Sequence, residues 1–117
     1  MSKNLTPHED KEQEAVVQYL EAKKLKFTAI PNSTYTKSFK QKMKNKRIGL
    51  RAGLPDLLII IKNKLVFIEM KRQKGSTTSY EQKEWIKALN NISPSIEAHI
   101  CYGASEAIDL IKLIFKK

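Results

Sequence analysis

Residues 53–71 read GLPDLLIIIKNKLVFIEMK, and this stretch decides the fold. It holds two nearly continuous apolar runs, at 57–61 and 65–71, on either side of the polar segment Lys62-Asn63-Lys64. Short runs that are apolar at consecutive positions are typical of strands in a sheet covered on both faces. The polar segment between them predicts a tight connection, so we expect the two runs to form an antiparallel hairpin.

Outside the polar connection, the charged residues of this hairpin are Asp56, Glu69 and Lys71, and its register predicts that they meet at one end. If residues 63–64 form a two-residue turn, Asp56 lies opposite Lys71. Side chains alternate between the two faces of a strand, so Glu69 and Lys71 point to the same side, and in this register Asp56 joins them. The sequence therefore predicts two carboxylates and an ammonium group at one end of the sheet.

Two carboxylates and a lysine suit the hydrolysis of phosphodiester bonds, which needs an activated water and positive charge against the transition state. Mg²⁺ and Mn²⁺ prefer oxygen ligands, and we expect Asp56, Glu69 and the backbone carbonyl of Met70 to supply them. Lys71 would orient or deprotonate the water. A solvated face is the ordinary explanation of Glu-x-Lys on a strand, but buried charges in an otherwise apolar strand are costly without partners.

Residues 6–25 predict a helix that brings further polar groups to this site. The helix opens with Thr-Pro-His-Glu, a capping box with proline at its first helical position. Positions 9, 13, 16, 17 and 20 share one face, which is apolar except for Glu9 and Gln13. If this face packs over the charged end of the sheet, Glu9 adds a third carboxylate and Gln13 hydrogen-bonds within the site. Glu14 is the alternative acid, although it lies off the apolar stripe.

The remaining patterns predict an α/β fold in the order α-β-β-β-α-β-α. They indicate strands at 26–30 and 96–102, a helix at 79–91 that starts with a second capping box, and a last helix from about Ser105 to 115. We expect a mixed central sheet flanked by helices, within a single domain over residues 1–117.

The formal charge of +10 favours a polyanionic partner, nucleic acid above all. The positive charge is concentrated, since residues 33–55 contain no acidic side chain. We expect a basic loop or short helix at about 33–48 that grips DNA phosphates without reading sequence. The residues expected to contact DNA, of which the two arginines lie nearest the acidic motif, are Lys37, Lys40, Lys44, Lys46, Arg47 and Arg51.

Membrane and extracellular proteins fit the sequence poorly. No segment approaches the roughly 20 apolar residues of a spanning helix, and the lysines are not matched by an apolar face on the same helix. The single cysteine, Cys101, cannot form an internal disulfide. We therefore expect a cytoplasmic protein with no membrane partner.

Four segments resemble the VRR-NUC branch, the virus-type replication and repair nucleases, of the PD-(D/E)XK nuclease superfamily. They are Glu9-x-x-x-Gln13 leading to Tyr19-Leu20, GLRAGLPD at 49–56, FIEMK at 67–71 and SYEQKEW at 79–85. The resemblance implies a restriction-endonuclease-like core in which Asp56 and Glu69 bind metal and Lys71 is catalytic. It also matches Glu9 to the acid of the first helix, and Gln82 to a glutamine near the site, for which helix capping is the alternative role.

The resemblance further implies an activity and an assembly. Family members cut branched or flapped DNA in repair and recombination, and stand-alone phage and bacterial members are similar to small dimeric Holliday-junction resolvases. We therefore expect a homodimeric endonuclease that depends on Mg²⁺ or Mn²⁺, in a bacterial or phage-infected host cell. The alternative is a non-catalytic DNA-binding module that retains the nuclease fold and needs the basic tract but not the acidic residues.

Overall fold

The elements of the chain are defined by a computed structural model that describes residues 7–31 and 37–117, with side chains from residue 10 onward. Along the chain they are α1 (Pro7–Ala22), β1 (Lys26–Ala29), α2 (Phe39–Arg47), β2 (Leu57–Ile61), β3 (Lys64–Lys71), α3 (Tyr80–Asn90), β4 (Ile96–Tyr102) and α4 (Ala104–Lys116). The predicted order lacked α2, which forms within the stretch at about 33–48 where a basic loop or a short helix was expected. Thr6, the predicted cap of the first helix, lies outside the described residues.

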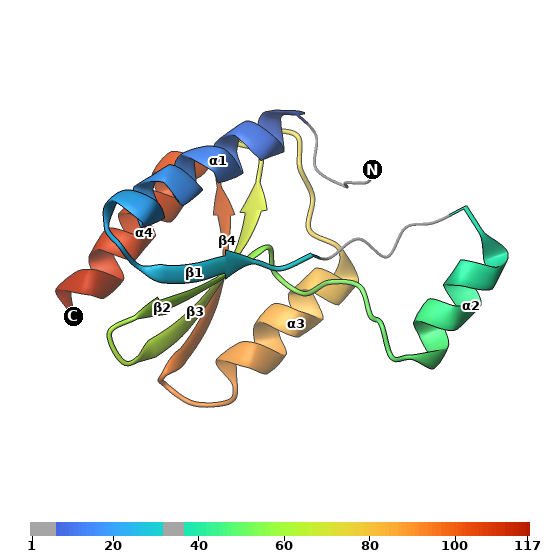
Figure 1. The fold of residues 1–117 in the computed structure, drawn as a ribbon. Helices are drawn as coiled ribbons and strands as arrows, with labels where there is room; N and C mark the ends of the chain where they lie inside the picture. The colour runs from blue at the N-terminus through green and yellow to red at the C-terminus, as the bar shows by residue number, and fades with distance from the viewer. Residues whose placement is uncertain (1–6, 32–36) are drawn as a thin grey trace.

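The four strands form one mixed sheet in the order β1-β2-β3-β4. The first three strands are antiparallel, and β4 runs parallel to β3. Helices α1 and α4 cover one face and α3 covers the other, where it packs on β4 (Figure 1). This arrangement confirms the predicted α/β class with a mixed sheet flanked by helices. No helix in the described part of the chain is long and apolar enough to cross a membrane.

The turn of the central hairpin differs from the prediction by one position. It lies at residues 62–63, where Lys62 has a φ of 54°, and Leu57 pairs with Ile68. Asp56, directly before β2, therefore lies level with Glu69, and the predicted pairing of Asp56 with Lys71 is wrong. The turn falls earlier because Lys64 belongs to β3, where its ammonium donates to the carbonyl of Pro94 at 3.2 Å and bonds the Glu97 carboxylate. Pairing shifts by two residues, so every side chain keeps its predicted face.

The apolar core lies between the sheet and the helices α1 and α4. Alternate side chains of β2 and β3 point to it, as the pleat of a strand requires. Its buried members are Val16, Leu20, Leu57, Ile59, Ile61, Val66, Ile68, Met70, Cys101, Ala104, Ala107, Ile111 and Ile114. Because Ile68 and Met70 occupy this face, Glu69 and Lys71 face α3 instead.

Helix α4 is capped by a residue from the other end of the chain. Its N-cap is Gly103, which has no side chain, and Ser105 lies inside the helix, so the predicted start at Ser105 is wrong. Glu12 of α1 accepts a hydrogen bond from the Ala104 backbone N–H at 2.7 Å and another from the Gln73 amide at 3.3 Å. A carboxylate satisfies the free N–H groups and favours the positive end of a helix. Glu12 thus ties α1 to α4 and to the segment after β3.

Candidate active site

Glu69 and Lys71 of β3 form a buried ion pair. Only 4% of Glu69 and 8% of Lys71 is exposed, and Lys71 Nζ lies 3.6 Å from Glu69 Oε2. Their neighbours on the strand are apolar and face the core. Burying two charges costs free energy that a single ion pair recovers only with further hydrogen bonds. The structure provides those bonds from α3.

Gln82 of α3 joins the two charged groups. Its Oε1 accepts from Lys71 Nζ at 2.9 Å, and its Nε2 donates to Glu69 Oε2 at 2.8 Å. The same amide closes a capping box, in which Oε1 accepts from the Ser79 backbone N–H at 3.0 Å and Ser79 Oγ accepts from the Gln82 N–H at 3.1 Å. Both roles considered for Gln82 are therefore compatible in one conformation. The capping box therefore fixes the Gln82 amide in the position from which it bonds Glu69 and Lys71.

Asp56 approaches β3 from the neighbouring strand. Its Oδ2 accepts a hydrogen bond from the Met70 backbone N–H at 2.8 Å. The N–H and C=O of one strand residue point to the same neighbouring strand, so the Met70 carbonyl is directed to the side of Asp56. The Lys71 carbonyl points the other way and accepts from the Gly103 N–H at 2.9 Å. Asp56 and the Met70 carbonyl therefore lie on the same side of β3.

Gly53 sets the approach of the segment that carries Asp56. Its φ is 106°, and a Cβ built there would lie 2.8 Å from the Glu81 backbone and from the Trp85 ring. The Trp85 indole N–H donates to the Ala52 carbonyl at 3.0 Å. Glycine is required here because a backbone with positive φ passes directly against α3. Trp85 thus holds the loop before Asp56.

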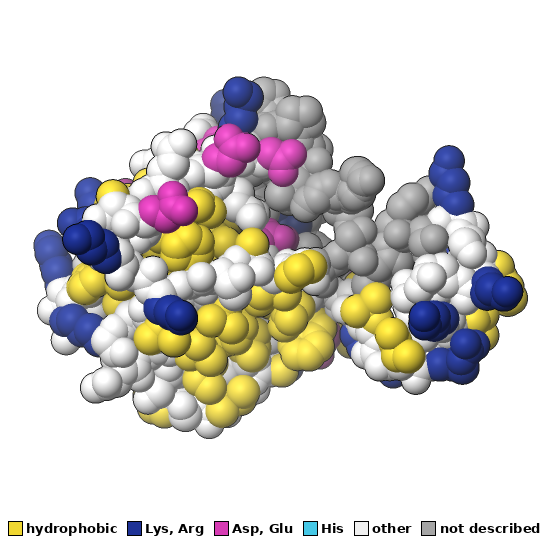
Figure 2. Space-filling model, viewed as in Figure 1, with side chains coloured by type: hydrophobic (Ala, Val, Ile, Leu, Met, Phe, Trp, Pro, Cys, Tyr) yellow, Lys and Arg dark blue, Asp and Glu magenta, His cyan; other side chains and the backbone are white. Residues whose placement is uncertain are grey.

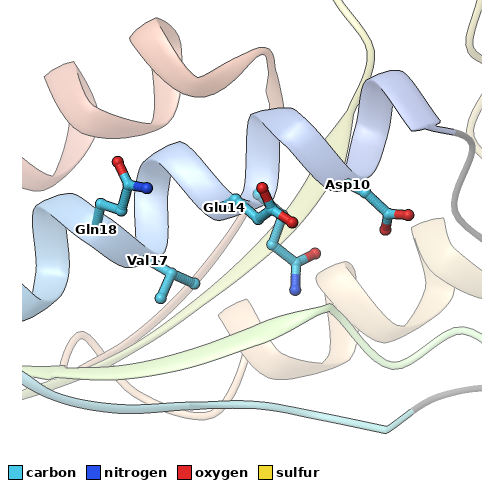
Figure 3. Close-up of a pocket in the computed structure, with 5 residues that line it drawn as sticks. Asp10, Glu14, Val17 and Gln18 are labelled. Atoms are coloured by element: carbon cyan, nitrogen blue, oxygen red, sulfur yellow. The ribbon is translucent and has the colours of Figure 1, made fainter.

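The N-terminal part of α1 borders a separate open pocket of about 320 Å³, lined by Asp10, Gln13, Glu14, Val17 and Gln18. Figure 3 shows the Asp10 and Glu14 carboxylates extending from α1 at this pocket. Gln13 Oε1 is buried there and has no hydrogen-bond partner in the part of the chain that the structure describes. The Glu9 side chain lies outside the described residues, so its role as a third carboxylate stays a prediction, as does that of Gln13.

The donors around Glu69 fit a hard divalent ion. Asp56, Glu69 and the Met70 carbonyl offer only oxygen, which Mg²⁺ and Mn²⁺ prefer to nitrogen or sulfur. Among the described residues no group of three or more His, Cys, Asp or Glu is placed to hold a metal. A site built here would therefore combine two carboxylates with the carbonyl and water, an arrangement common for Mg²⁺.

Helix α2 carries much of the positive charge and stands away from the sheet (Figure 1). None of its residues is buried, and Figure 2 shows several Lys and Arg side chains on it. The residues predicted to contact DNA are all exposed, and they lie on α2 or directly beside it: Lys37, Lys40, Lys44, Lys46, Arg47 and Arg51. An open groove of about 410 Å³ runs from α2 to α3, lined by Lys42, Asn45, Lys46, Leu50, Arg51, Ala52 and Glu81.

Only part of the predicted basic set lines this groove. Lys46 and Arg51 do, whereas Arg47 is exposed but is not among the lining residues. Lys42 lines the groove and was missed. Positions 42 and 46 are one turn apart on a helix, so a choice of the helix over the loop would have pointed to Lys42.

Comparison with known proteins agrees with this fold. Residues 3–105 match the VRR-NUC domain family. A solved structure described as a VRR-NUC domain protein is 27% identical to this chain and superposes with a TM-score of 0.74. The match covers 98% of this chain and 92% of the chain in that structure. A second, described as a VRR-NUC domain, is 18% identical over 92% of this chain and 97% of its own, with a TM-score of 0.65, and supports the fold. No protein of curated function matches the chain.

Proposed function

The chain belongs to the VRR-NUC domain family, a nuclease-type family, and from this premise we propose that it is a divalent-metal-dependent DNA endonuclease. The proposed substrate is branched or structured DNA, of the Holliday-junction or flap type, in replication, recombination or repair. The observation that carries the proposal is the buried Glu69–Lys71 pair held by Gln82.

The ion pair calls for a functional explanation because it is expensive as a structural element. Replacing a buried, hydrogen-bonded ion pair by apolar residues of similar volume is often neutral or stabilising. The rest of β3 shows that apolar residues suit this strand, since Val66, Phe67, Ile68 and Met70 are all buried. A charged pair at its end, beside Asp56, is what a hydrolytic site requires and a packing role does not.

The chain's own groups have distinct parts in the proposed reaction. Asp56, Glu69 and the Met70 carbonyl would hold the divalent ion, which when bound supplies positive charge to activate water and stabilise the departing oxygen. The Lys71 ammonium has three donors, of which one goes to Gln82 Oε1 at 2.9 Å. A further donor of Lys71 is the group to orient the attacking water or to bond a phosphate oxygen in the transition state.

The exposed charge of α2 favours a second candidate, the non-catalytic DNA-binding module. Such a module would bind through α2 and leave Glu69 and Lys71 without a chemical task. Replacement of Glu69 separates the two candidates, since it should abolish cutting by the first and leave binding by either unchanged.

The test is a cleavage assay with labelled linear, flapped and four-way-junction DNA in Mg²⁺, Mn²⁺ or EDTA. Glu69→Gln removes one negative charge and keeps the side-chain shape, and Glu84→Gln, on the exposed surface of α3, is the matched control. We expect cutting by wild type and by Glu84→Gln only with metal, and none by Glu69→Gln. Binding of every substrate with no cutting under any condition would replace the proposal by the DNA-binding module.

Assembly is tested on the same protein. We propose a homodimer, because a symmetric junction presents two equivalent strands to be cut. Sedimentation at assay concentrations should give twice the chain mass of 13.5 kDa. A monomer would exclude paired cutting of a four-way junction by this chain alone.

A further inference from the structure

The surface of α2 combines positive charge with an exposed aromatic ring. Phe39, its first residue, is 76% exposed, and Met43, one turn on, is 38% exposed. The nine residues of the helix include Lys40, Lys42, Lys44, Lys46 and Arg47, and no acid. An aromatic ring left in water amid this charge suits a partner that has both phosphates and flat apolar faces, and nucleic acid has both.

The groove between α2 and α3 gathers part of this charge. Lys42, Lys46 and Arg51 provide cations along it, and Leu50 and Ala52 add apolar contacts. Phe39 shares the face of α2 that carries Lys42 and Lys46, because these positions are three and seven residues apart. The groove has a volume of about 410 Å³, within the range of roughly 300–1,000 Å³ that is usual for small-ligand pockets. A nucleotide unit is of a size that fits such a space.

The residues that line the groove are neighbours in sequence of residues in the candidate active site. On one side Arg51 and Ala52 continue through Gly53 to Asp56. On the other side Glu81 lines the groove, and the next residue of α3, Gln82, bonds Glu69 and Lys71. A strand that lies in the groove would therefore lie beside the two segments that carry Asp56 and Gln82.

We propose that α2 and this groove bind a single-stranded segment of DNA, with its phosphates on Lys42, Lys46 and Arg51 and a base stacked on Phe39. This inference rests on the proposed function, since it assumes a DNA substrate, and it narrows that substrate to DNA with an unpaired strand. A flap or a frayed branch provides such a strand, and an intact linear duplex does not.

The first test measures binding in EDTA, where cutting cannot interfere. A labelled thymidine oligonucleotide and a duplex of equal length are titrated, with fluorescence anisotropy as the readout. Base stacking on an aromatic side chain contributes roughly 1–3 kcal/mol, so Phe39→Ala should weaken single-strand binding by about 5- to 150-fold. Phe39→Tyr, which keeps the ring, should bind as wild type does, and so should Leu113→Ala on α4, which removes an exposed apolar side chain elsewhere.

The second test uses salt dependence to count phosphate contacts. Each phosphate contacted on a single strand adds about −0.7 to the slope of log affinity against log salt. The double variant Lys42→Gln/Lys46→Gln should therefore make the slope shallower by about 1.4. Lys40→Gln/Lys44→Gln removes the same charge from the same helix outside the groove and should change the slope less. Equal changes in the two double variants would overturn the groove as the binding site.

Failure of this inference differs from failure of the proposed function. A preference for single strands with no cutting in any metal would exclude the proposed nuclease activity and support single-strand binding in the groove. Cutting with no preference for single strands, or with Phe39→Ala binding DNA as wild type does, would support the nuclease activity and overturn single-strand binding in the groove. A change in sedimentation of Phe39→Ala with unchanged DNA binding would also overturn it, and would assign α2 to a second copy of the chain.

Discussion

Replacement of Gln82 by glutamate separates its two structural roles. Glutamate serves at the third position of a capping box as well as glutamine does, so the start of α3 should be preserved. The change replaces the Nε2 donor by a carboxylate oxygen 2.8 Å from Glu69 Oε2, while the other oxygen remains 2.9 Å from Lys71 Nζ. Gln82→Glu therefore alters the contacts of the ion pair without removing the cap.

The size of the effect follows from these two distances. At an effective dielectric constant of about 20, the repulsion from Glu69 and the attraction to Lys71 are each about 6 kcal/mol and nearly cancel. What remains is the lost hydrogen bond to Glu69, and hydrogen bonds to charged groups contribute about 1.5–3 kcal/mol. We expect Gln82→Glu to be about 2 kcal/mol less stable than wild type at pH 7.

This deficit should depend on pH. A proton shared between the introduced carboxyl and Glu69 would restore a hydrogen bond between the two side chains. Protonation then favours folding, and the deficit shrinks as pH falls from 7 toward 4. Urea unfolding at several pH values measures it, with Gln82→Ala, which also loses the cap bond, as the comparison.

Activity provides the second readout for the same variant. Because Gln82 contacts Glu69 and Lys71, Gln82→Glu should lose cutting while its helix content is unchanged. Wild-type stability at pH 7, an unchanged pH profile and full cutting would together refute the reasoning, and would reduce Gln82 to a helix cap.

Three further variants or conditions test other parts of the structure. Gly53→Ala should lose more than about 2 kcal/mol of stability in urea unfolding, since a strained backbone alone costs roughly 1–3 kcal/mol and the added Cβ would meet α3. Gly49 also has a positive φ but lies in open space, so Gly49→Ala should lose less. Burial raises the pKa of Cys101 to about 12, so its thiol should resist Ellman's reagent at pH 8 until urea is added. The stability of the protein should decline as pH rises above 9.0, because the thiol ionises first in the unfolded state. The hydrogen bond from Lys64 lowers the pKa of Glu97, so Glu97→Gln should cost up to about 1 kcal/mol of stability in urea unfolding at pH 7. The difference in stability from wild type should disappear as pH falls below 4.5, because the wild type loses the same charge there.

The hairpin and its face assignments could be predicted because they depend on a period of two. An error of one position in the turn moved the pairing by two residues, so Asp56, Glu69 and Lys71 kept their common side. The partner of each residue could not be predicted, since it depends on Lys64 finding Glu97 on a strand more than 30 residues later. That contact is not local, and local patterns do not contain it.

Helix α2 could be predicted only as one of two alternatives, a basic loop or a short helix. None of its residues is buried, so its sequence has no apolar stripe of the usual width, and the periodic signal of a packed helix is absent. A local signal was present in Ser38, whose hydroxyl accepts from the Gln41 N–H at 3.1 Å as an N-cap. Reading that cap would have placed Lys42 and Lys46 on one face.

Glu12 was missed because its partner is distant. Its two hydrogen bonds go to Ala104, 92 positions later, and to Gln73. Glu12 lies beside the apolar stripe of the first helix and has no special spacing from other acids. Only the assembled contact between α1 and α4 distinguishes it from a solvated glutamate.

This long contact has a consequence for how the protein is made. A chain leaving the ribosome presents α1, Asp56, Glu69 and Lys71 before α4 has been synthesised. Helix α1 packs on β3 and on α4, so part of its contacts needs residues from 104 onward. Closing a loop of that length comes late because its entropy must be offset by the completed core. A nascent chain that ends before α4 would therefore carry the basic helix α2 without a seated α1. Any cutting that needs α1 would then begin only once the last helix has folded.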